Sequence, residues 1–132
     1  MHADIERKLA QVLAQDGGVR LAVLFGSLAD GPGRPDSDVD LAVAGNQALD
    51  ADTKRRLIDA AAQVSGRPID LVDLRTAGYF VLRQALVHGR MLYCADQSIL
   101  AQLRTRMVIE GADFAPYHRR MLRERRRAWI GM

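Results

Sequence analysis

Apolar side chains recur along this chain at two spacings, one typical of helices and the other of strands. A first helix is expected to begin near Asp4, which would cap it, and to end at Gly17–Gly18. Two further helices are predicted, one closing at Gly66 and one over residues 79–88. The apolar stripes of the first two are Ile5, Leu9, Val12 and Leu13, and Leu57, Ile58, Ala61 and Ala62.

Four short apolar runs, bounded by glycine, proline or polar residues, predict four strands. The second run alternates carboxylates with apolar residues, so one of its faces is free for function. A helix is expected between the second and third strands, which suits a parallel crossover, although the pattern leaves the strand order open. The runs are VRLAVLF (19–25), SDVDLAVA (37–44), PIDLVDL (68–74) and RMLYCA (90–95).

The end of the chain is expected to be helical in two pieces. A helix should run from Ser98 to about Gly111, Pro116 should interrupt it, and a basic helix should follow. The order of elements then predicts an α/β (α+β) layer fold, with a mixed sheet of about four strands flanked by helices. At 132 residues we expect a single domain, with a core at about 1–95 and a helical basic tail at about 96–132.

The charge is concentrated in that tail. The whole chain carries +3, whereas residues 101–132 hold eight arginines against three acidic residues. Three interpretations stay open: a solvated helix face whose apolar residues pack inward, a surface that docks a partner, or a nucleic-acid contact. The apolar runs are too short to span a membrane and no secretory signal is evident, so a cytoplasmic protein is expected. The single cysteine, Cys94, favours a buried, inert thiol.

The second strand raises a chemical question, because Asp38 and Asp40 should project from the same face. Neighbouring carboxylates repel one another unless a cation binds them, and oxygen ligands favour Mg²⁺ or Mn²⁺. Asp70, on the third strand, is the candidate for a further donor. Asp73 is the rival, but it lies an odd number of positions away, so we interpret it as a cap for the following helix. The alternative is that such aspartates are merely solvated.

A Gly26–Ser27 turn comes directly after the first strand. Glycine permits a close approach of the backbone to a ligand, and free N–H groups with a hydroxyl form a cradle for phosphate. A triphosphate held there would lie near the predicted metals. The alternative is an ordinary turn without a ligand.

The stretch GSLADGPGRPDSDVDLAV (26–43) resembles the signature of the DNA polymerase β-type nucleotidyltransferase superfamily, and the short chain is similar to its minimal nucleotidyltransferase (MNT) branch. The resemblance covers about residues 19–95. It implies a polymerase β-like fold, and it assigns the nucleotide phosphates to Gly26 and Ser27. It further implies metal binding by Asp38 and Asp40, with Asp70 as third carboxylate and general base. Arginines that many relatives carry after Gly-Ser are replaced here by Leu28 and Asp30, which leaves Arg34 as the nearby cation for nucleotide.

The resemblance also implies a function. MNT proteins include antitoxins paired with HEPN-domain toxins, and a bare core suggests that a second molecule completes the acceptor site. We therefore expect an antitoxin that transfers AMP from ATP to a tyrosine of a HEPN toxin in a hetero-oligomer. The alternatives are a non-catalytic antitoxin acting by occlusion, or a nucleotidyltransferase acting on a small molecule or an RNA end.

Overall fold

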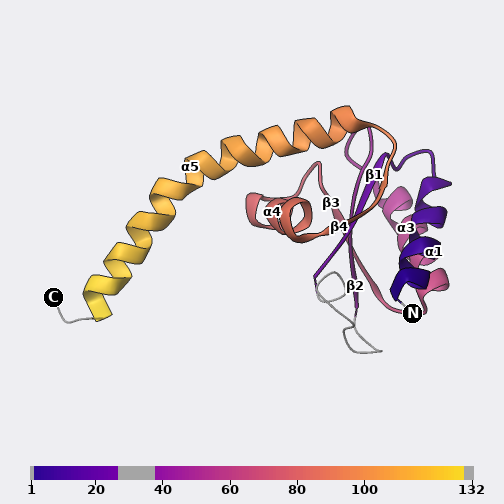
Figure 1. Cartoon of the computed structure of the whole chain (residues 1–132), viewed down its shortest axis with the longest axis horizontal. Helices are drawn as coiled ribbons and strands as arrows, with labels where there is room; N and C mark the ends of the chain where they lie inside the picture. The colour runs from indigo at the N-terminus through magenta and orange to yellow at the C-terminus, as the bar shows by residue number, and fades with distance from the viewer. Residues whose placement is uncertain (1, 27–37, 130–132) are drawn as a thin grey trace.

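The fold is a four-stranded mixed sheet with helices on both faces (Figure 1). The computed structural model describes residues 2–26 and 38–129, and the side chains of residues 3–26 and 38–113. Its elements in chain order are α1 (His2–Ala14), β1 (Leu21–Phe25), β2 (Val39–Ala44), α3 (Ala51–Ser65), β3 (Ile69–Asp73), α4 (Tyr79–His88), β4 (Arg90–Cys94) and α5 (Gln97–Trp129). The predicted α/β class, the four strands and the first three helices are thereby confirmed.

The strands lie in the order β3-β2-β1-β4. β1 pairs antiparallel with both β2 and β4, whereas β2 and β3 are parallel and joined through α3, the parallel crossover that the sequence allowed without requiring it. The end of β1 therefore meets the beginnings of β2 and β3 at one edge of the sheet. Phe25 is paired with Asp40, and Asp40 is paired with Asp70.

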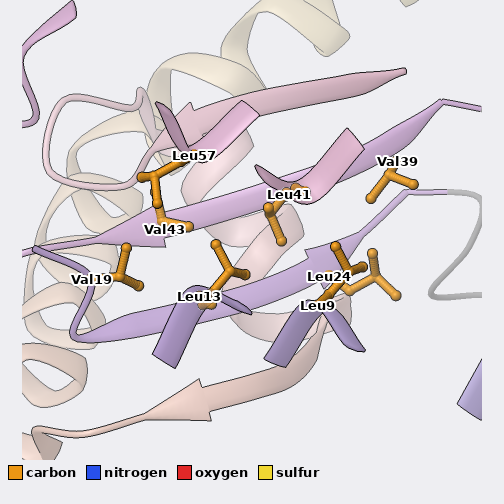
Figure 2. Close-up of a cluster of buried hydrophobic side chains, with 10 residues drawn as sticks. Leu9, Leu13, Val19, Leu24, Val39, Leu41, Val43 and Leu57 are labelled. Atoms are coloured by element: carbon orange, nitrogen blue, oxygen red, sulfur yellow. The ribbon is translucent and has the colours of Figure 1, made fainter. Parts of the chain in front are cut away.

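One face of the sheet is covered by α1 and α3, which lie on the same side of it in Figure 1. Figure 2 shows leucines of α1 and α3 packed against alternate residues of β1 and β2. Because successive strand residues point to opposite faces, Val39, Leu41 and Val43 all enter this core and are fully buried. The remaining labelled members are Leu9, Leu13, Val19, Leu24 and Leu57.

The other face is covered by α4 and the first turns of α5. The intervening residues of β1 and β2, such as Val23 and Ala42, pack there against Leu82 of α4 and Leu103 of α5. Beyond this core α5 leads away from the sheet as a long curved helix (Figure 1). Among the described residues, no helix is both long enough and apolar enough to cross a membrane.

Two expectations about aspartates at helix ends are wrong. Asp4 does not cap α1, which already begins at His2; it lies in the first turn and accepts a hydrogen bond from Arg7. Asp73 does not cap α4, whose N-cap is Gly78. Its carboxylate is buried and accepts hydrogen bonds from the backbone N–H of Leu49 and Arg75, so it ties the end of β3 to the loop that precedes α3.

The predicted break in the last helix is also wrong, because α5 runs unbroken for 33 residues through Gly111 and Pro116. Gly111 is not in the left-handed conformation of a helix-ending glycine; among the described residues only Gly26 and Gly66 have positive φ. Gly111 instead leaves room for a neighbour, since a Cβ there would lie 2.9 Å from the hydroxyl of Tyr79. Pro116 removes one hydrogen bond, which a long helix can absorb by bending.

Candidate nucleotidyltransferase site

Three predicted site residues meet at the edge of the sheet where β1 ends and β2 and β3 begin. Asp40 is the second residue of β2 and Asp70 the second residue of β3, and the parallel register places them directly opposite one another. Gly26 follows the last residue of β1, which is itself paired with Asp40. The sequence pattern thus brings Gly26, Asp40 and Asp70 together although 44 positions separate the first from the last.

The face on which this pair lies follows from the alternation along the strands. Asp40 has the same parity as Ala42, and Asp70 the same as Val72, and both apolar residues belong to the core under α4 and α5. The aspartates therefore lie on that face, beyond the edge of its core. Asp70 is exposed and Asp40 half-buried, so a ligand can reach them from solvent.

The carboxyl groups at this edge are electrostatically coupled. Burial raises the pKa of Asp40 above its ordinary value, and the charge of Asp70 and a hydrogen bond between the two carboxyl groups raise it further. The charge of Asp38, which is exposed just before β2, adds to the same effect. A carboxylate held in this way among like charges is stabilised by a bound proton or cation. The donor set, oxygen atoms of neighbouring aspartates, fits a hard divalent cation.

Gly26 fits against the Asp40 side chain. It has a φ of +75°, a left-handed conformation that residues with a Cβ adopt at a cost. A Cβ on Gly26 would overlap the Oδ2 atom of Asp40 and would lie 2.9 Å from its Cγ and 3.2 Å from its Cβ. Only a glycine therefore allows the turn after β1 and the Asp40 carboxylate to occupy this edge together.

The structure does not describe all of the predicted site residues. Ser27 and Arg34, together with Leu28 and Asp30, lie outside the described residues. Within the described part of the chain, no three histidine, cysteine, aspartate or glutamate side chains are grouped closely enough to hold a metal ion. Metal binding by Asp38, Asp40 and Asp70 therefore stays a prediction.

Sequence reasoning missed two arginines that hold α5 to the core. The Arg106 guanidinium donates hydrogen bonds to the backbone carbonyls of Leu74, Arg75 and Ala77, in the connection that follows β3. Arg75 donates to the carbonyl of Gly45 and to the side chain of Gln102 on α5. The spacing along the helix could have indicated the role of Arg106, because it lies three positions after the buried Leu103 and so on the inward side of α5.

Cys94 carries a free thiol, as predicted, but its side chain is half-buried rather than fully buried. It ends β4, where it packs against the core under α4 and α5.

Comparison with known proteins identifies the sequence family of the chain. The model of the family "Polymerase beta, Nucleotidyltransferase" matches residues 7–98. A curated relative, the protein adenylyltransferase MntA of Shewanella oneidensis, is 31% identical over 93 residues, which is 70% of this chain and 67% of that protein.

Solved structures share the fold. A chain from a complex of tri-AMPylated HEPN toxin with MNT antitoxin, from Shewanella oneidensis, aligns with a TM-score of 0.73 at 22% identity, over 94% of this chain and 98% of that one. A chain from a toxin–antitoxin structure with AMP-PNP aligns with a TM-score of 0.70 at 25% identity, over 89% of this chain and 98% of that one. A minimal nucleotidyltransferase aligns with a TM-score of 0.54 at 31% identity, over 64% of this chain and 85% of its own length. Since the family model spans more than half of the sequence, this chain belongs to the polymerase beta nucleotidyltransferase family.

Proposed function

We propose that this chain is an antitoxin that transfers AMP from ATP to a tyrosine of a partner HEPN-domain toxin and so neutralises it. The observation that carries the proposal is the pairing of Asp40 with Asp70 beside Gly26 at one edge of the sheet. The adenylyltransferase activity named for the MntA relative, and the AMPylated toxin and AMP-PNP of the related complexes, support this substrate and this acceptor.

In this proposal the turn after β1 binds the nucleotide. Gly26 lets the backbone approach the phosphates closely, while Ser27 and Arg34 supply a hydroxyl and a positive charge. Asp38, Asp40 and Asp70 would hold Mg²⁺ or Mn²⁺, which neutralises charge on the phosphate groups when bound. The raised pKa of Asp40 supports this assignment, because burial and the charges of Asp70 and Asp38 all disfavour a bare carboxylate there, and a bound cation would offset them.

The chemical step needs a base. A tyrosine hydroxyl has a pKa near ~10 and attacks poorly until its proton is removed. Asp70 is exposed at the site and takes that proton. The phenolic oxygen then forms a bond to the α-phosphorus of ATP, the bond from that phosphorus to the bridging oxygen breaks, and pyrophosphate leaves with the bonding electrons.

The domain organisation and the cellular compartment are part of the same proposal. We assign the whole chain, 1–132, to one nucleotidyltransferase domain whose tail extends from about residue 96. We place the reaction in the cytoplasm, where ATP is available and where a lone thiol such as Cys94 stays reduced.

The test is mass spectrometry of the toxin after co-expression. With the wild type, the toxin tyrosine should carry AMP. Asp70→Asn should lower the rate of transfer by about 10²- to 10⁴-fold, the usual contribution of a positioned base, and should leave the complex intact. Asp59→Asn, which removes the same charge from an exposed position on α3, should transfer at the wild-type rate.

The competing function is neutralisation by occlusion, in which the aspartates play no part. It predicts that wild type and Asp70→Asn protect equally and that the toxin carries no AMP with either. Modification of an RNA end or a small molecule, with an unmodified toxin, would point to another acceptor.

A further inference from the structure

The outward face of α5 is apolar where a surface helix would ordinarily be polar. Val108 and Ile109 are 68% and 58% exposed, whereas Ile99, Leu100 and Leu103 on the opposite side of the same helix are buried. The exposed side chains are therefore not the inward stripe of α5, which is already covered by the core. They form a second apolar stripe that no described part of the chain covers.

This second stripe is hollowed. An open hollow of about 570 Å³ extends along α5 from Ala101 past Thr105 to Ile109, with Gln102, Arg106 and Glu110 along its polar side. A smaller one of about 280 Å³ lies between Arg104 and Val108. These positions are spaced three or four apart, so small and larger side chains alternate along one line of the helix. Such a line of knobs and hollows is the surface against which another helix packs.

The charge around the stripe selects the kind of partner. Around Val108 and Ile109, Arg104 and Arg106 are balanced by Glu110 and Asp113. The excess of +5 comes from positions 119–127, further along α5, where a second copy of this chain would bring the same charge against it. An apolar centre is equally unsuited to the phosphates of RNA, which are bound through continuous basic surfaces. The complementary partner is a helix with an apolar stripe that becomes acidic toward the arginine-rich end of α5.

The comparisons indicate where such a partner would come from. The family model ends at residue 98, so most of α5 lies outside the conserved nucleotidyltransferase core. The toxin–antitoxin chains align over 94% and 89% of this chain, more than residues 1–96 contain, so those alignments extend into α5. The minimal nucleotidyltransferase aligns over 64%, which the core alone can supply.

We infer that the outward stripe of α5, centred on Val108 and Ile109, is the docking surface for a helix of the HEPN-domain toxin. The inference rests on the proposed function, because it takes the toxin as the partner. It goes further in separating the docking surface from the catalytic edge of the sheet. The fixed base of α5, where Arg106 binds the carbonyls after β3, holds this surface in a constant relation to Asp70.

The experiment measures toxin binding by isothermal titration calorimetry, with a purified, unmodified HEPN-domain toxin as the probe. Val108→Asp and Ile109→Asp should each raise the Kd at least about tenfold, because each puts a charge into a contact that must lose its water. Both side chains are exposed, so the variants should fold and should keep the wild-type rise in melting temperature with Mg²⁺ and ATP. The control is Val87→Asp on α4, which changes a 52% exposed valine away from α5 and should bind as the wild type does.

The outcomes separate the docking surface from the proposed function. If the wild type binds and modifies the toxin, and the two α5 variants do so equally well, the surface assignment is overturned while the function stands. If the wild type neither binds nor modifies the toxin, both fail. If the α5 variants keep toxin binding but lose self-association, the stripe binds a second copy of this chain and not the toxin. If they lose RNA binding instead, the stripe binds RNA and not the toxin.

Discussion

Replacing Gly26 by alanine tests whether the turn after β1 and the Asp40 carboxylate depend on one another. Alanine at a φ of +75° is strained by roughly 1 to 2 kcal/mol. Its Cβ would also overlap Oδ2 of Asp40 and come within 2.9 Å of Cγ. The Asp40 side chain must then turn away, at a further cost of roughly 0.5 to 1.5 kcal/mol for a poor rotamer. We expect a total destabilisation of about 1.5 to 3.5 kcal/mol.

The chain supplies a matched control for the strain alone. Gly66, at the end of α3, has a φ of +67°, and a Cβ there would meet no atom within 4 Å. Gly66→Ala should therefore lose only the roughly 1 to 2 kcal/mol of backbone strain. Urea denaturation at constant m-value measures both variants, and the difference between them is the cost of displacing Asp40.

Activity should separate the two variants more widely than stability does. A displacement of about 1 Å of a catalytic group can cost on the order of 10²-fold in rate, so Gly26→Ala should lose AMP transfer by at least that factor. Gly66 lies only four residues before Asp70, but a Cβ there would meet no neighbouring atom, so Gly66→Ala should transfer normally when folded. In an Asp40→Ala background most of the overlap is gone, and Gly26→Ala should cost little more than Gly66→Ala. Equal stability losses in the two glycine variants, with transfer retained by both, would refute the proposed dependence.

Two further predictions concern the helices. In a helix, replacing glycine by alanine ordinarily stabilises the protein by about 1 kcal/mol. Gly111→Ala should not show this gain, because the new Cβ would lie 2.9 Å and 3.0 Å from two atoms of Tyr79. In a Tyr79→Ala background the same change should stabilise the protein. Urea denaturation of both pairs decides this, and the same sign in both backgrounds would contradict it. The hydrogen bond from Arg56 lowers the pKa of Asp16 below 3.8, so its stabilising contribution should be complete above pH 3.8 and lost as the pH falls through the lowered folded-state value. The urea midpoint of Arg56→Gln should accordingly lie below that of wild type at pH 7 and approach it as the pH falls below 3.8. A difference that stays constant with pH would argue against the pair.

The two central strands, β1 and β2, were predictable because they are short and buried on both faces. Residues 21–24 and 41–44 are all buried, so an apolar run bounded by polar residues was a sufficient signal. The site was predictable as a set of residues for a related reason. A carboxylate within an apolar strand, as at Asp40, stands out against its neighbours.

The sequence could not show how the strands pair. That Asp40 lies opposite Asp70 depends on a parallel register between β2 and β3, and the crossover through α3 permitted that register without requiring it. The raised pKa of Asp40 is a consequence of this pairing and could not be inferred from either strand alone.

Two of the wrong predictions share a physical cause, which is a partner distant in sequence. Asp73 had the local signature of a helix cap, but the backbone N–H of Leu49 lies within hydrogen-bond distance, and a buried carboxylate must take such donors. Gly111 had the signature of a helix end, but it makes room for the ring of Tyr79. Local rules describe what a residue favours, and tertiary contacts decide which preference is used.

Strand β3 connects the proposed catalytic edge of the sheet with the base of α5, which carries the proposed docking surface. β3 begins next to the catalytic edge, with Asp70 as its second residue, and spans five residues to Asp73. The chain that follows it, at Leu74 and Arg75, supplies carbonyl acceptors for Arg106 of α5. A helix held by three charge-assisted hydrogen bonds to this connection cannot rotate freely about its base. A toxin helix docked on the outward stripe of α5 would therefore have a defined position relative to Asp70. Transfer to a tyrosine requires that precision, because the hydroxyl must approach the α-phosphorus along one direction.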